Sequence, residues 1–149
     1  MKHEYLVNLL MEQVEVLKEL LDVVKNQQES LVNNNREKLD ESVKSEEFLF
    51  VKIDHLQKSI KAELRRIDMD EDLKLKEIKL SELIKYYSTV DTKAARNMVL
   101  IRQHIANYMK EIGRLNYQNG FLIDHAKEII KQVIRSVAQN QNAIFDRRV

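Results

Sequence analysis

The sequence predicts an all-α protein built from a few long helices. Its 149 residues include no Pro and only two Gly, so few positions force a helix to end. Charged residues make up 33% and hydrophobic residues 44% of the chain, a mixture typical of amphipathic helices rather than of disorder. Apolar residues recur at alternating steps of three and four, which keeps one helix face against a partner. We expect one helical domain over residues 1–149, a coiled-coil-like bundle made of an antiparallel hairpin, a short helix and one very long C-terminal helix.

The first two helices are expected to form the hairpin. The first is predicted from about His3 to Val32, because apolar residues recur there every seven positions, at Leu10, Leu17, Val24 and Leu31. Three Asn residues follow, and Asn favours caps and turns over helix interiors. Asn34 with Glu37 three residues later predicts the cap, so the second helix starts near Asn35. A turn this short between two long helices makes them antiparallel.

The second helix is expected to end in the acidic run 68–72. Residues 73–76 then alternate apolar and charged side chains and are expected to be extended or a frayed helical turn. A short helix is predicted over 81–87, capped by Ser81. Ser88, followed by Asp91 three residues later, predicts the start of the last helix.

The last helix is expected to run to about Asn140. Fifty residues at 1.5 Å each span about 75 Å, so this helix must lie along the hairpin and part of it can project past the hairpin. The remaining residues, 139–149, are mostly polar and are expected to form a mobile tail.

Asn119 interrupts the apolar face of the last helix. The face is otherwise formed by Met98, Ile101, Ile105, Tyr108, Ile112, Leu115, Leu122, Ala126, Ile129 and Val133. A buried Asn in such a position lowers stability but sets the register and the choice of partner. We therefore expect Asn119→Leu to raise stability and to loosen the register. Gly113 and Gly120 share another face, which predicts either tight packing against the short helix or the docking of a partner.

The composition excludes several classes of function. A net charge of +1 provides no general attraction to nucleic acid. The chain has no Cys, so we expect neither disulfides nor thiolate metal sites. We find no signal peptide and no run of about 20 apolar residues, so we expect a cytoplasmic protein without membrane insertion.

Catalytic and metal motifs are incomplete. Asp68, Asp70 and Asp72 have the spacing that begins a calcium loop, but Leu73 stands in place of its Gly and Lys79 in place of its final Glu. None of the four His has the Glu partner of a di-iron bundle, and no HExxH pair is present. We therefore expect no enzymatic activity, no metal and no cofactor.

The C-terminal third is unusually rich in apolar residues. A face this wide is either bundle core, which we favour for Leu122 and Ile129, or an open surface that pairs with a partner helix. The candidate partner-binding residues are Leu122, Ile123, Ile130, Val133, Ile134, Val137, Ile144 and Phe145.

One segment resembles a known family. Residues 111–123 resemble the Leu-Asn-x-x-Asn-Gly-x-Leu-Leu core of the FlgN-type flagellar export chaperones, through Leu115, Asn116, Asn119 and Gly120. Residues 80–84 resemble the segment before that family's long last helix, and residues 49–56 its second helix. The chain departs from the family where Ser45-Glu46 replaces a Glu-Lys pair, which puts any role of that pair in doubt.

The resemblance implies a non-enzymatic cytoplasmic chaperone. Such proteins bind hook-associated (hook–filament junction) flagellar subunits by helix pairing and deliver them to the type III export apparatus, so the implied partners are these subunits and export-gate components. By the resemblance, substrate binding falls on residues 122–145. The chaperone would be a monomer or a weak homo-oligomer. The alternative is a structural coiled-coil adaptor or self-assembling helical bundle, and a third class, a metal-dependent bundle enzyme, would contain bound metal.

Overall fold

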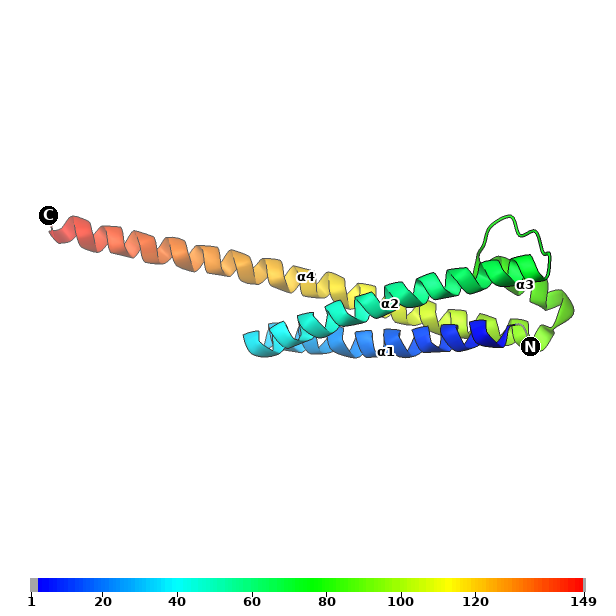
Figure 1. Cartoon of the computed structure of the whole chain (residues 1–149). Coiled ribbons are helices and arrows are strands. Elements are labelled where there is room, and N and C mark those ends of the chain that lie inside the picture. The colour runs from blue at the N-terminus through cyan, green and yellow to red at the C-terminus, as the bar shows by residue number, and fades with distance from the viewer. Residues whose placement is uncertain (1–2, 149) are drawn as a thin grey trace.

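The fold is a helical bundle from which one helix projects (Figure 1). The computed structural model describes the backbone of residues 3–148 and the side chains of residues 3–138. Within this part, the helices are α1 (Glu4–Val32), α2 (Arg36–Asp70), α3 (Leu80–Val90) and α4 (Thr92–Arg148). The all-α prediction is confirmed, and so are the hairpin, the short helix and the very long last helix. At 1.5 Å per residue, the 57 residues of α4 span about 86 Å.

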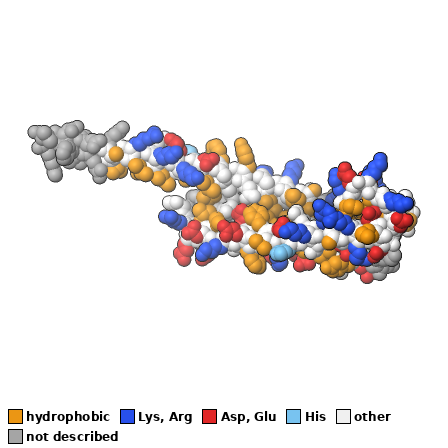
Figure 2. Space-filling model, turned by 45° about the horizontal axis from the view of Figure 1, so that its top comes forward, with side chains coloured by type: hydrophobic (Ala, Val, Ile, Leu, Met, Phe, Trp, Pro, Cys, Tyr) orange, Lys and Arg blue, Asp and Glu red, His pale blue; other side chains and the backbone are white. Residues whose placement is uncertain are grey.

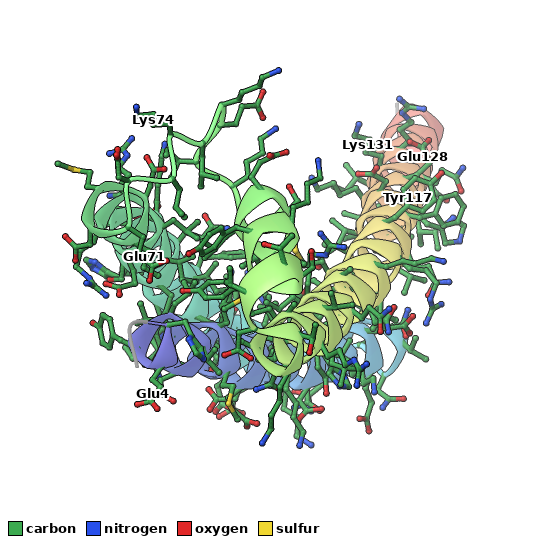
Figure 3. The ribbon with its side chains drawn as sticks, turned by 90° about the vertical axis from the view of Figure 1, so that its right-hand side faces the viewer. Glu4, Glu71, Lys74, Tyr117, Glu128 and Lys131 are labelled. Atoms are coloured by element: carbon green, nitrogen blue, oxygen red, sulfur yellow. The ribbon has the colours of Figure 1, made fainter. Side chains whose placement is uncertain are left out.

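Helix α1 lies at the centre of the packing. It contacts α2 on one side and α4 on the other, and α3 packs on α4. Helices α1 and α2 are antiparallel, whereas α4 runs in the same direction as α1 and continues past the α1–α2 turn (Figure 1). In the view along the bundle, α2 and α4 lie on either side of α1, and α3 lies between them at one end (Figure 3).

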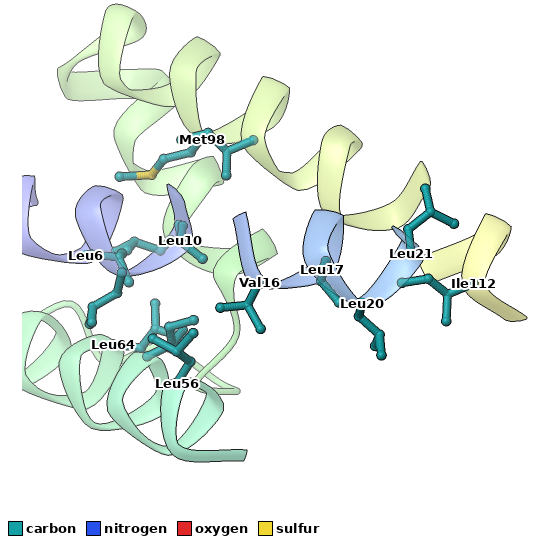
Figure 4. Packing of buried hydrophobic residues seen from close by; sticks show 14 of the residues in the cluster. Leu6, Leu10, Val16, Leu17, Leu20, Leu21, Leu56, Leu64, Met98 and Ile112 are labelled. Atoms are coloured by element: carbon teal, nitrogen blue, oxygen red, sulfur yellow. The ribbon is translucent and has the colours of Figure 1, made fainter. Parts of the chain in front are cut away.

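The core consists of leucines and other apolar residues from all four helices. Leucines from successive turns of α1 face Leu56 and Leu64 of α2, and others face Met98 and Ile112 of α4 (Figure 4). The side chains that are almost wholly inaccessible include Leu6 and Val24 of α1, Ile67 of α2, Leu83 of α3 and Met98 of α4. Since each such side chain stabilises the fold by about 1.5–3 kcal/mol, the periodic residues of α1 hold α2 and α4 in place.

The hairpin turn differs by one residue from the prediction. Asn34 adopts φ 53°, a left-handed conformation that Asn tolerates better than most residues, and it reverses the chain. The cap is Asn35, whose side-chain oxygen accepts a hydrogen bond from the Lys38 backbone N–H at 3.2 Å. The assignment of the cap to Asn34 was therefore wrong, because Asn34 is needed for the turn itself.

Both predicted serine caps were also wrong. Helix α3 begins at Leu80 after Lys79, without a side-chain cap, so Ser81 lies inside its first turn. Ser88 lies inside α3 as well, and its hydroxyl donates to the Lys85 carbonyl at 2.6 Å. The cap of α4 is Asp91, whose carboxylate accepts from the Ala94 N–H at 3.1 Å.

The segment between α2 and α3 is irregular. Asp72 and Lys74 have φ of 49° and 52°, and the Asp68 carboxylate accepts a hydrogen bond from the Leu75 N–H at 3.0 Å. This acidic side chain thus shapes the connection. Helix α4 continues to Arg148 rather than ending near Asn140.

Candidate partner-binding surface on the last helix

Helix α4 changes from a buried to an exposed helix partway along its length. Ala94, Met98, Ile101, Ile112, Leu115 and Asn119 are buried against the bundle. Leu122 and Ile123 are half-buried, and every residue from 124 to 138 is exposed. The change coincides with the α1–α2 turn, past which α4 projects alone (Figure 1).

The projecting segment carries an apolar stripe. Its side chains are 47–62% exposed and belong to Ile129, Ile130, Val133, Ile134 and Val137. At about 100° per residue these positions span about 140° of the helix surface, wide enough for two neighbouring helices. Figure 2 shows hydrophobic side chains gathered along one edge of this segment, with Lys and Arg along the opposite edge. The assignment of Ile129 to the bundle core was therefore wrong.

The stripe continues the face by which α4 packs on α1. Steps of seven residues lead from Leu115 through Leu122 to Ile129, and from Asn119 through Ala126 to Val133. The first residue of each series is buried, and the last is exposed. The face thus loses its partner because the hairpin turns back after Val32, while its apolar pattern continues.

Asn119 lies at the last buried position of this face. It is 2% exposed, and its amide nitrogen donates to the Val24 carbonyl at 3.2 Å and to Gln27 Oε1 at 3.3 Å. One position earlier, Gln118 accepts a hydrogen bond from Gln28 at 2.9 Å. These bonds join α4 to the C-terminal turns of α1 just before α4 leaves the bundle.

Gln27 also links Asn119 to the second helix. Burial raises the pKa of the Glu46 carboxyl in α2, and a hydrogen bond from Gln27 opposes this shift. One oxygen of Glu46 is buried and has no hydrogen-bond partner among the described residues. Gln27, Glu46 and Asn119 therefore form a polar layer across three helices. The sequence did not predict this layer, although Gln27 occupies an apolar position of the heptad pattern and Glu46 belongs to the pair that departs from the family pattern.

Replacing Glu46 by Gln should stabilise the protein at neutral pH. A carboxyl whose pKa is raised in the folded state favours folding at low pH, and this contribution is lost as pH rises above its ordinary value of 4.5. Because solvent screens this partly exposed carboxylate, we expect Glu46→Gln to gain only about 0.5 kcal/mol at pH 7, or roughly 1–2 °C in Tm, and to lose this advantage toward pH 4. Thermal melts at both pH values check this. The exposed Glu41→Gln is the control, and a variant less stable than the parent at pH 7 would show that the carboxylate is favourably bonded.

The family-like residues divide between two faces of α4. Leu115 is buried and Asn116 half-buried, whereas Gly113 and Gly120 are exposed. A Cβ atom on either glycine would meet no atom of the described residues within 4 Å, so the alternative that this face packs tightly against α3 was wrong. Tyr117 between them is 80% exposed and points away from the bundle (Figure 3). Docking of a partner on this glycine face remains a prediction.

The predicted binding residues are only partly within the described structure. Ile130, Val133, Ile134 and Val137 share one exposed face, and the half-buried Leu122 and Ile123 lie where that face meets the bundle. Ile144 and Phe145, with the predicted mobile tail 139–149, lie outside the residues whose side chains are described.

Among the described residues, no three His, Asp or Glu side chains are grouped so that they could hold a metal ion. No helix in the same part of the chain has the length and apolar character needed to cross a bilayer.

Comparison with known proteins identifies one family. The family model described as FlgN protein matches residues 1–146, nearly the whole chain. No curated protein and no solved structure matches the sequence.

Proposed function

The chain belongs to the FlgN family of flagellar chaperones, and we propose that it binds hook-associated subunits in the cytoplasm by helix pairing and delivers them to the type III export apparatus. The observation that carries this proposal is the open apolar stripe on α4. It continues a helix-packing face beyond the point where the protein's own hairpin ends, so it is shaped to receive a helix.

The partner segment would take the place of the hairpin along the projecting part of α4. Heptad spacing is the same in the buried and exposed parts, so an incoming amphipathic helix can pack on Ile129 and Val133 as α1 packs on Leu115 and Ile112. The width of the stripe leaves room for a second helix beside the first. A subunit terminus that is unfolded before assembly would thus fold on the chaperone.

The energetics favour a reversible complex. Burying a Val or Ile side chain completely contributes about 1.5–3 kcal/mol, and the five stripe residues are already about half buried, so each gains roughly 1 kcal/mol. The sum, about 5 kcal/mol, is comparable with the 2–5 kcal/mol that ordering a disordered segment costs. Tight binding therefore needs further contacts, and a partner held mainly by this stripe is easily released at an export gate.

Helicity measurements test the proposal. We expect the mean helical ellipticity of a mixture with a purified hook-associated subunit to exceed the sum of the separate proteins, because the subunit terminus gains helix on binding. A terminal peptide of the same subunit should reproduce the gain, and its composition-matched scrambled version should not. No gain in ellipticity and no binding with any hook-associated subunit would contradict the proposal.

Sedimentation distinguishes the structural alternative. A self-assembling adaptor would form a tight oligomer that buries residues 122–145, whereas the proposed chaperone sediments as a monomer or weak dimer until the subunit is added. Export-gate components are proposed as later partners of the chaperone–subunit complex.

A further inference from the structure

A second apolar surface lies between α3 and α4, at the end of the bundle far from the stripe. It is a groove of about 520 Å³ formed where α3 packs on the first turns of α4. Its residues are Ile84, Ser88, Thr92, Ala95, Arg96, Val99, Leu100 and Gln103. The volume lies in the range of sites that accept a small ligand or a bulky side chain.

The walls of the groove are apolar and accessible. Ile84 of α3 and Val99 of α4 are half-buried, and Ala95 at its base is buried. Leu100 is 55% exposed, and it is not one of the apolar residues by which α4 packs on the bundle. The bundle therefore leaves an apolar concavity open at this position, and Leu100 has no role in the core.

Basic side chains outnumber acidic ones along the part of α4 that forms the groove. Arg96 lines the groove and forms no ion pair in the described structure. The nearby acidic side chains are already engaged, since Glu82 pairs with Lys85 and the Asp91 carboxylate caps α4. Residues 92–114 contain five Lys or Arg and a single acidic residue, Glu111, which pairs with Arg114.

We propose that this groove binds a short acidic, amphipathic segment of a partner protein. One bulky apolar side chain of that segment enters between Ile84, Val99 and Leu100, and a carboxylate beside it pairs with Arg96. A concave apolar site favours an inserted side chain over a flat surface such as a membrane, and the surrounding charge selects an acidic segment over a basic one.

This binding is independent of the proposed function of the stripe. Leu100 and Ile134 are 34 positions apart on one helix, which corresponds to about 50 Å. A partner in the groove and a subunit on the stripe can therefore bind at the same time, and variants of one surface leave the other intact.

Three dye-labelled probe peptides of equal length test the proposal by fluorescence anisotropy with the full-length protein. The first carries a central Leu-Phe pair flanked by Glu, the second the same pair flanked by Lys, and the third Ala-Ala flanked by Glu. We expect the first to bind with micromolar affinity and each of the others at least tenfold more weakly. In NMR spectra, the first should shift the methyl signals of Ile84, Val99 and Leu100.

Two variants and a matched control locate the site. Leu100→Asp and Arg96→Glu should each weaken binding of the first peptide at least tenfold. Met109→Asp introduces the same charge at a position on α4 that is also 55% exposed but outside the groove, and it should bind like the parent. The double variant Ile130→Asp with Ile134→Asp should likewise bind the first peptide with the affinity of the parent.

Several results would overturn the proposal. They are no binding of the first peptide, equal binding of the Lys-flanked peptide, or unchanged affinity in Leu100→Asp. Binding to vesicles of anionic phospholipid without binding of the first peptide would assign the basic surface to a membrane instead.

Discussion

Replacing Ile130 and Ile134 together by Asp should abolish binding of hook-associated subunits and leave the fold intact. Both side chains are more than half exposed, so their loss removes little burial from the folded protein. We expect the free energy of unfolding to fall by about 1 kcal/mol or less for the two substitutions together, roughly 2–4 °C in Tm. In a complex the two Asp side chains would be desolvated against apolar groups, so the affinity should fall by at least 100-fold.

The chain offers a closely matched control on the same segment. Lys131→Gln with Arg135→Gln lowers the net charge by the same two units on the same turns of α4, but on the face opposite the stripe. Calorimetric titration with a purified subunit should show normal affinity for this control. A large fall in Tm of the Ile variant would instead mean that the stripe is buried in an oligomer of the free protein, as a self-assembling adaptor requires.

Replacing Asn119 by Asp should produce the largest loss of stability of any single change considered. A carboxylate at this position would be almost fully buried and would face two acceptors, the Val24 carbonyl and Gln27 Oε1, to which it cannot donate. An uncompensated buried charge costs about 3–5 kcal/mol. Urea unfolding at pH 7 should show a loss of this size, and the loss should shrink at low pH as the new carboxyl becomes protonated.

The exposed Asn107→Asp, on the same helix, is the control and should behave like the parent protein. A loss in Asn119→Asp no larger than in this control would show that α4 does not pack on α1 at Asn119.

The hydrogen bonds of Asn119 also alter the expectation for Leu at this position. The heptad pattern predicts that Asn119→Leu raises stability, but this change removes the donor that satisfies the buried Gln27 side chain. We now expect the single variant to be less stable than the parent, and Asn119→Leu with Gln27→Leu to recover the loss. A single Leu variant that is clearly more stable than the parent would instead support the prediction from the heptad pattern, which is that Asn119 lowers the stability of the fold.

The sequence predicted the helices well and their caps poorly, and the two outcomes have different physical causes. The heptad residues of α1, such as Leu10, Leu17 and Val24, are buried as expected, since one apolar face is enough to define a long helix. Asn34 and Asn35 are equally good local caps, and only the left-handed conformation required at Asn34 distinguishes them. Ser88 resembled a cap, but α3 continues through it and Asp91 caps α4 instead.

The sequence identified the apolar residues of the candidate site but not which of them are exposed. The amphipathic pattern of Ile130, Val133, Ile134 and Val137 is visible in the sequence, whereas their exposure is not, because buried and open stripes have the same period. The groove beside α3 could not be anticipated at all. Leu100 and Ile84 become neighbours of one concavity only when α3 folds back on α4.

Three properties of this protein can be read from its sequence alone: it is a set of long amphipathic helices, α4 carries one continuous packing face, and its motif resembles the FlgN family. These properties follow from the period and type of residues along a single segment. Tertiary structure decided where that face ceases to be core, because the limit is set by the end of α1 at Val32. It also decided that Asn119 bonds to Gln27, 92 positions away, since contacts between distant segments depend on how the helices pack.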